Sequence, residues 1–365
     1  MLVILPTYKR LDCLRFTLQS MFRSSSPERE DMRLCVVSND PFHHNEVAKV
    51  IESAQDDFDS AHHWTIRIIC RPKTLDPIKS WYSAVSEHAL PNEAVVLQGD
   101  DDLFMPRSFI QRHRAIRDSD ADMILNRTIH GLTYLDSIHC QLDSPISVNR
   151  FACAPYEIAW AGITRWGPAF IGNHVYRWTD NFKNALDVAF EWCHKQDWLD
   201  FNTRTLMLPY YLPFAVKQVG GGLYGLDSVC VIRGGSLAEN TESRYGARSW
   251  NSLFLNLCTY GVLTDSPLSS IPELDGAREE NLRLACRGYA GYFLDNRISP
   301  SIRKETFARI HPPWMRYPWE LAYSFRNEIT HFLRLRAIKL RLYKHLGLFR
   351  PVKTAELIET LGKDS

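Results

Sequence analysis

Three adjacent carboxylates, Asp100, Asp101 and Asp102, form the group of residues in this sequence best suited to chemistry. They directly follow an apolar run at 94–98, as a turn after a buried strand would. Adjacent carboxylates repel one another, so a bound cation stabilises them. Mg²⁺ and Mn²⁺ prefer oxygen ligands, and such an ion can neutralise the charge that develops on a diphosphate leaving group. The alternative interpretation is a solvated acidic turn that caps the next helix.

The elements that would position this triplet alternate between two hydrophobic periods over the first 130 residues. Apolar or β-branched runs predict strands at 2–5, 33–37, 65–70, 94–98 and 123–125. Helices are predicted between them, at 11–22, 45–54, 77–89 and from about residue 106 onward. This order predicts an α/β protein with a mostly parallel, three-layer sheet.

In sheets of this kind, ligands bind at the carboxyl ends of the strands. Polar residues follow all four leading strands, at Pro6-Thr7-Tyr8, Ser38-Asn39-Asp40, 71–73 and 99–102. Their common placement favours a ligand site over the helix-capping alternative for the acidic triplet.

The rest of the chain changes character twice. Residues 131–235 are less regular and rich in Trp, Tyr, Gly and Pro, and the last third shows helical patterns at 250–263, 277–296, 301–310 and 319–346. We therefore expect three parts, at 1–130, 131–235 and 236–365. A mobile loop around 236–249 and a C-terminal helical region would complete 236–365.

Composition limits the class of protein and its partners. The chain has 365 residues, 45% of them hydrophobic and 23% charged, and a net charge of +1, which gives no strong field for nucleic acid. Nine scattered cysteines without CxxC spacing indicate reduced thiols and a cytoplasmic protein. The opening MLVILPTYKR is expected to be a strand rather than a signal peptide, and no apolar run approaches the ~18 residues of a membrane span.

Four segments now stand in order along the chain: ILPTYKR at 4–10, VVSNDP at 36–41, SWYSAV at 80–85 and GDDDLFMP at 99–106. Together they resemble family two of the inverting glycosyltransferases, which have the GT-A fold. The resemblance covers about residues 1–235 and is clearest over the first 115. It implies a catalytic domain at 1–235, with a nucleotide-binding half at 1–130 and an acceptor half at 131–235. It implies a hexosyl- or pentosyltransferase that uses a nucleotide-sugar, with a UDP-sugar as the expected donor and Mn²⁺ or Mg²⁺ as cofactor.

The resemblance also assigns roles by position. Asp100 matches the acid near the ribose, Asp101 matches the metal ligand, and Asp102 is a second candidate ligand. Gly99 stands where the family often has another acid, so the division within the triplet stays open. Asn39 stands where the family has an acid that binds the base. The donor-binding candidates are Pro6, Thr7, Tyr8, Arg10, Asn39, Asp40, Lys79, Asp100 and Arg233.

An inverting transfer needs a base that takes the proton of the acceptor hydroxyl. The family carries this base in a Glu-Asp pair at a helix start, and Gln196-Asp197-Trp198 resembles that pair. Asp197 is therefore the predicted base, with Asp187, Glu191 and Asp200 as competitors. Arg244 and Arg248 are weaker phosphate-binding candidates than Arg233, and His174 is expected to make a structural contact.

The C-terminal segment 329–353 is basic, because all of its residues that are charged at neutral pH are Lys or Arg. An imperfect apolar stripe accompanies it: Phe325, Ile329, Phe332, Leu335, Leu342 and Leu346. A helix of this kind can lie on an anionic membrane surface, which would suit a lipid-linked glycan acceptor. The interpretation slightly preferred from sequence is a helix that packs this stripe on the catalytic domain. A cell-surface glycan acceptor is also considered, and a nucleic-acid acceptor is less favoured.

Three other functions stay open. The first is a nucleotide-sugar or glycan-binding module without catalysis, and the second is a glycosyltransferase for modified DNA. The third is a nucleotidyltransferase, although Tyr8-Lys9-Arg10 lacks the glycines that such an enzyme has after its first strand. The formal dinucleotide fingerprint at Gly220, Gly222 and Gly225 is discounted, because a strand rather than a helix is predicted after it.

Overall fold

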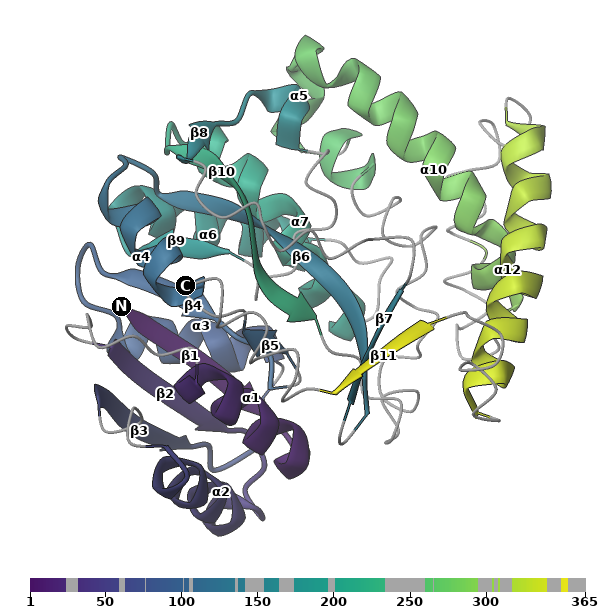
Figure 1. Cartoon of the computed structure of the whole chain (residues 1–365). Coiled ribbons are helices and arrows are strands. Elements are labelled where there is room, and N and C mark those ends of the chain that lie inside the picture. The colour runs from purple at the N-terminus through teal and green to yellow at the C-terminus, as the bar shows by residue number, and fades with distance from the viewer. Residues whose placement is uncertain are drawn as a thin grey trace.

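The computed structural model is an α/β protein with a large, twisted, mixed sheet (Figure 1). It describes residues 1–23, 32–58, 63–75, 77–100, 102–104, 108–134, 137–141, 154–163, 174–195, 201–233, 260–264, 266–294, 304, 308, 317–339 and 349–353. The strands are β1 (Leu2–Thr7), β2 (Met32–Ser38), β3 (Trp64–Cys70), β4 (Ala94–Leu97), β5 (Leu103–Phe104), β6 (Met123–Tyr134), β7 (Ser137–Gln141), β8 (Tyr156–Glu157), β9 (Val175–Arg177), β10 (Leu223–Arg233) and β11 (Phe349–Lys353). The helices are α1 (Leu11–Arg23), α2 (His44–Asp56), α3 (Pro77–His88), α4 (Ser108–Arg117), α5 (Trp160–Ile163), α6 (Asp180–His194), α7 (Phe201–Gln218), α10 (Asp275–Leu294) and α12 (Pro318–Lys339), with 3-10 turns η4 (Pro267–Ser270) and η5 (Pro272–Leu274).

The predicted fold class is confirmed. β3, β2, β1 and β4 lie side by side and all run parallel. β9 is antiparallel to both β4 and β6, and β10 then pairs parallel with β6. The N-terminal half therefore has the 3-2-1-4 strand order of a Rossmann-like sheet, extended on one side by the β9, β6 and β10 strands.

Alternate residues of β1 show why the sheet has a layer of helices on each face. Leu2 and Ile4 are fully buried in the core cluster that contains residues of α3, α6 and α7. Val3 and Leu5 are fully buried in the other cluster, which contains residues of α1, α2 and α4. Because each full burial of such a side chain contributes about 1.5–3 kcal/mol, a continuously apolar strand is stable only when both of its faces are covered.

β6 runs well beyond the predicted 123–125. Its continuation is held by parallel pairing with β10 as far as His130 and then by a hairpin with β7. The residues after 125 include Asn126, Arg127, Thr128 and His130, so they carry no apolar run. Their strand conformation depends on partners more than eighty residues away in the sequence, which local periodicity does not report.

Two glycines of the discounted dinucleotide motif have structural roles between α7 and β10. Gly220 has φ +82 at the end of α7, a conformation that side chains with a Cβ rarely adopt. A Cβ on Gly222 would lie 2.9 Å from the carbonyl oxygen of Asp120, so this residue has to be small. β10 follows as a strand, as predicted.

The C-terminal helices belong to the same core. Val262, Leu274 and Leu282 lie in the cluster that also holds Leu2 and Ile4. α12 packs along α10, as Figure 1 shows, and β11 pairs antiparallel with β7, a strand that the sequence did not predict. Within the described part of the chain, no helix is long and apolar enough to cross a membrane.

Candidate functional site

The carboxyl ends of β1, β2 and β4 meet at one edge of the sheet. Thr7 is the register partner of Ser38, and the backbone N–H of Asn39 donates to the Thr7 carbonyl at 3.1 Å. On the other side of β1, the N–H of Gln98 donates to the Ile4 carbonyl at 2.9 Å. The polar segments that follow these three strands are therefore neighbours in space, as the strand-end rule predicts.

Among the described carboxylates of this edge, Asp100 is the most deeply buried, with 1% of its surface exposed. One carboxylate oxygen accepts a hydrogen bond from the Thr7 hydroxyl at 2.8 Å. The other forms an ion pair with the guanidinium of Arg10. A buried carboxylate needs a cation and hydrogen-bond donors to offset its lost hydration, and these two residues supply both.

Thr17, on α1, fixes the backbone of the acidic triplet. Its hydroxyl lies 2.9 Å from the Asp100 carbonyl and 3.0 Å from the Asp102 carbonyl, and its one proton is shared between these two acceptors. Asp102 is buried, with 8% exposed, and Asp101 lies outside the described residues. The sequence analysis did not identify Thr17. Its position beside Leu14, Leu18 and Met21, on the apolar side of the predicted helix, indicated a buried side chain, and Thr17 is fully buried.

Asn39 binds a loop rather than pointing freely into solvent. Its side-chain nitrogen donates to the Leu75 carbonyl at 2.8 Å, and its side-chain oxygen accepts from the Leu75 N–H at 2.9 Å. This two-way bond ties the end of β2 to the chain after β3. The side-chain amide of Asn39 has one further N–H and one further oxygen lone pair. A contact to a nucleotide base would have to use these two groups.

Asp40 shapes the turn into α2. Its carboxylate accepts from the Phe42 N–H at 3.1 Å, contacts the His43 imidazole at 2.9 Å and lies 3.9 Å from the Lys9 ammonium. Lys9 has φ 58, a left-handed conformation that costs about 1–2 kcal/mol for a residue with a Cβ. That turn directs the chain from Tyr8 to Arg10, beside Asp100.

The remaining predicted residues lie around this edge or outside the described region. Pro6 is part of β1 beside Val37, Tyr8 is partly buried, and Lys79 is exposed on α3. Arg233 is the last residue of β10 and pairs with His130, but its side chain is not described. The candidates outside the described residues are Gln196, Asp197, Trp198, Asp200, Arg244 and Arg248.

The two described competitors of Asp197 lie on α6 and are exposed. Asp187 accepts a hydrogen bond from the Tyr82 hydroxyl at 3.1 Å; burial, and then the Asp187 charge, raise the pKa of Tyr82. Glu191 pairs with Lys195 at 2.6 Å, and this hydrogen bond lowers the pKa of its carboxyl. A lowered pKa makes a carboxylate a weaker base, so Glu191 is the less suitable of the two.

His174 makes the structural contact that was expected. Its Nδ1 accepts from the Asn126 N–H at 3.3 Å, and the ring is 3% exposed. Burial, with the nearby charge of Arg112 as a second cause, lowers the pKa of His174 to about 3. The imidazole is therefore neutral at physiological pH.

Among the residues that the structure describes, no group of three or more His, Cys, Asp or Glu side chains could hold a metal ion. Both oxygens of Asp100 are engaged by Thr7 and Arg10, so Asp101 and Asp102 are the residues of the triplet that could hold a metal. Mg²⁺ sites in nucleotide-binding proteins use one or two carboxylates together with substrate phosphates. The chemistry of these two residues thus fits a divalent cation.

No protein-family model matches this sequence, and no curated protein matches it. The solved structures to which this chain shows some similarity include S. aureus TarS 1-349 in complex with UDP-GlcNAc, at 15% sequence identity and a TM-score of 0.45, covering 80% of this chain and 72% of that chain. TarS 1-349 in complex with UDP is 12% identical, with a TM-score of 0.45, and covers 100% of this chain and 90% of that chain. TarS 1-349 alone is 11% identical, also with a TM-score of 0.45, and covers 89% and 88%.

Proposed function

We propose that this chain is a metal-dependent, inverting glycosyltransferase that transfers a sugar from a UDP-sugar to an acceptor hydroxyl. The observation that carries the proposal is the buried Asp100 carboxylate at the carboxyl edge of the parallel strands, held by Thr7 and Arg10. Ligands of such sheets bind at this edge, and a nucleoside diphosphate offers hydroxyls for a carboxylate and phosphates for a guanidinium.

Arg10 is suited to meet a phosphate while it remains paired with Asp100. Its side chain is 30% exposed, against 1% for the carboxylate, so the pair presents its cationic side to solvent. A guanidinium carries five N–H donors in a planar fork, a geometry that matches the oxygens of a phosphate as well as those of a carboxylate. A ribose hydroxyl is the proposed donor to the Asp100 carboxylate, because a carboxylate only accepts hydrogen bonds and each of its two oxygens can accept more than one.

Asp101 and Asp102 are the proposed ligands of Mn²⁺ or Mg²⁺. Thr17 contacts the backbone carbonyls of Asp100 and Asp102, which fixes the backbone of these two residues. When bound, the ion supplies positive charge to a diphosphate leaving group. The protein's own contribution is to keep the ligands in place before the donor arrives.

Asp197 is the proposed general base. It would accept the proton of the acceptor hydroxyl while that oxygen attacks the anomeric carbon and the nucleoside diphosphate leaves from the opposite face. The bond between acceptor oxygen and sugar forms as the bond to the diphosphate breaks, so the configuration inverts. A cell-surface glycan or a lipid-linked glycan is the proposed acceptor class.

Thermal-shift titrations with UDP-sugars, with and without Mn²⁺, test the proposal. Wild-type protein should be stabilised by a UDP-sugar only when Mn²⁺ is present, and slow donor hydrolysis should accompany binding. Asp101→Ala should lose both effects. Asp56→Ala, which changes an exposed carboxylate at the end of α2, is the matched control and should keep them.

Two results would contradict the proposal. If Asp101→Ala still bound and hydrolysed the UDP-sugar in the presence of a chelator, a metal at Asp101 would not take part in the reaction. Donor binding without any hydrolysis, together with no transfer to any acceptor, would instead indicate a binding module.

A further inference from the structure

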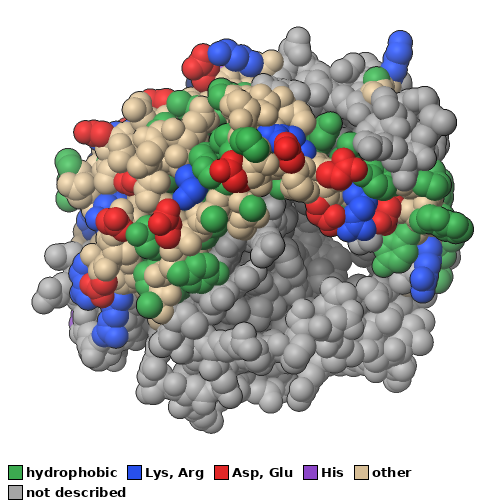
Figure 2. Space-filling model, turned by 90° about the horizontal axis from the view of Figure 1, so that it is seen from above, with side chains coloured by type: hydrophobic (Ala, Val, Ile, Leu, Met, Phe, Trp, Pro, Cys, Tyr) green, Lys and Arg blue, Asp and Glu red, His purple; other side chains and the backbone are tan. Residues whose placement is uncertain are grey.

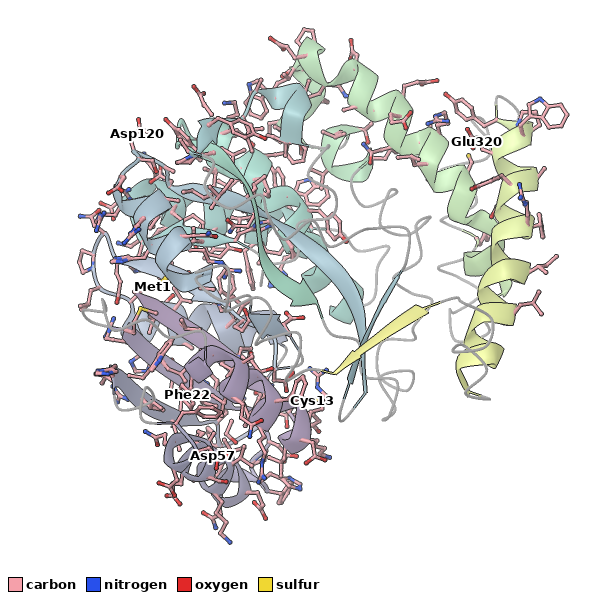
Figure 3. All side chains as sticks on the ribbon, in the orientation of Figure 1. Met1, Cys13, Phe22, Asp57, Asp120 and Glu320 are labelled. Carbon is pink, nitrogen blue, oxygen red and sulfur yellow. The ribbon has the colours of Figure 1, made fainter. Side chains whose placement is uncertain are left out.

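α12 has one face on the protein and one face in solvent. On the protein side, Glu320 pairs with Arg283 of α10 at 2.5 Å, and Ser324 is 1% exposed. On the same side, Leu321 packs against the core cluster that contains Leu2 and Ile4. Figure 3 places Glu320 next to α10, which agrees with these contacts.

The other face carries large hydrophobic side chains that the fold leaves in solvent. The exposed fractions are 85% for Trp319, 43% for Tyr323, 45% for Phe325, 64% for Ile329 and 60% for Leu333. Trp319 and Tyr323 are four residues apart, and so are Phe325, Ile329 and Leu333, so each set lies along one side of the helix. We call these five residues the outer face of α12.

This arrangement corrects the packing preferred from sequence. Phe325 and Ile329 belong to the apolar stripe that was expected to pack on the catalytic domain, yet both are exposed. The helix instead packs through Leu321 and Ser324, which lie outside that stripe. Ordinary surfaces expose single apolar residues, whereas five on one helix face indicate an interaction site.

The charged residues of α12 near the outer face indicate which kind of partner it would bind. Of the two carboxylates in α12, Glu320 pairs with Arg283 on the protein side. Glu328 is four residues after Ser324 and seven after Leu321, which places it on the protein side of the helix as well. Arg326 is exposed within the same stretch, and Arg334, Arg336 and Lys339 follow in the same helix. Figure 2 shows hydrophobic side chains gathered with basic ones at the α12 end of the molecule, on the right.

We propose that the outer face of α12 docks on a membrane surface that carries anionic lipid headgroups. Trp, Phe and Leu beside Lys and Arg is the composition of helices that lie in the membrane interface, with the apolar side in the acyl boundary and the cations at the headgroups. A second copy of this chain fits less well, because a symmetric α12 contact would bring the same arginines together. The proposal does not depend on the proposed transferase activity.

Co-sedimentation of the full chain with lipid vesicles tests this docking. The protein should bind vesicles of equimolar phosphatidylcholine and phosphatidylglycerol and should not bind vesicles of phosphatidylcholine alone. The Ile329→Ser/Leu333→Ser variant should weaken binding about tenfold for each side chain replaced, because their apolar surface no longer enters the lipid. Trp319→Ser, at the other end of the outer face, should weaken it independently.

Leu90→Ser is the matched control. Leu90 is 57% exposed, close to the value for Leu333, but lies in the turn between α3 and β4. This variant should bind vesicles as the wild type does. An absence of wild-type binding to the anionic vesicles would overturn the proposal, as would full binding by Ile329→Ser/Leu333→Ser. A dimer in gel filtration that this double variant dissociates, without vesicle binding, would assign the face to a second copy instead.

Discussion

Arg10 and Asp100 form an ion pair in which the carboxylate is 1% exposed and the guanidinium 30%. The two residues are ninety positions apart, and they meet because β1 and β4 are neighbours in the parallel sheet. This asymmetry of exposure means that the anion depends on its partner much more than the cation does. The pair therefore contributes to the stability of the sheet edge.

Arg10→Ala should destabilise the protein strongly. It leaves the Asp100 carboxylate buried without its cation, and removal of one member of a buried pair typically costs about 3–5 kcal/mol. Arg10→Ala/Asp100→Asn should recover a large part of the loss, because no charge then remains to be desolvated. Urea unfolding of the two single variants and the double variant, analysed as a double-mutant cycle, gives the coupling.

The pair between Arg117 and Asp118 provides the control cycle. Its partners are 60% and 58% exposed and lie 2.7 Å apart, so removing either one should give no measurable coupling. If the effects of Arg10→Ala and Asp100→Asn were simply additive, the ion pair would not stabilise the edge.

Asn39→Ala should release the loop that contains Leu75. Both the N–H and the carbonyl of Leu75 lose their partner in this variant, and two lost hydrogen bonds cost about 2–3 kcal/mol. Amide hydrogen exchange at Leu75 should accelerate along with the drop in unfolding free energy. Asn281→Ala is the matched control, because Asn281 is also buried but donates only to the Ala277 carbonyl within α10. Unchanged exchange at Leu75 would show that its N–H is protected by something other than Asn39.

The sequence predicted the parallel half of the fold because its signals are local. An apolar run such as 2–5 has to be buried on both faces, and the helix at 11–22 repeats its leucines at helical spacing. β11 and residues 126–130 of β6 were missed because they pair with strands that are far away in the sequence. Local propensity does not contain that information.

The candidate site was predictable to a similar extent. The strand-end rule brought Thr7, Asn39 and Asp100 to one edge without any knowledge of contacts. It did not predict that Asn39 binds Leu75, thirty-six residues away, or that Thr17 holds the triplet from α1. These contacts depend on loop geometry and helix packing, which follow from the folded structure as a whole.

Asp197→Asn should abolish sugar transfer while donor binding is kept. An amide has almost the shape of the carboxylate but cannot accept the acceptor's proton, and the loss of a general base typically lowers kcat by about 10²–10⁴-fold. Single-turnover kinetics of transfer and calorimetric titration with UDP separate the two effects. Asp187→Asn, at the exposed residue on α6 that binds Tyr82, should leave both unchanged. Wild-type turnover in Asp197→Asn would assign the base to another residue.

His174 should make the protein less stable as pH falls. Its pKa is about 3 in the folded protein and near 6.5 when unfolded, so the unfolded chain binds a proton first. The contribution of neutral His174 to the unfolding free energy is complete above about pH 6.5. Below that pH it falls by about 1.4 kcal/mol per pH unit, until the pKa of His174 in the folded protein is reached. In His174→Gln this slope should disappear, and the unfolding free energies of wild type and variant, measured in urea between about pH 7 and pH 4, should converge. His63→Gln, at an exposed histidine, should keep the wild-type slope. An identical slope in wild type and His174→Gln would show that His174 takes up its proton at the same pH in both states.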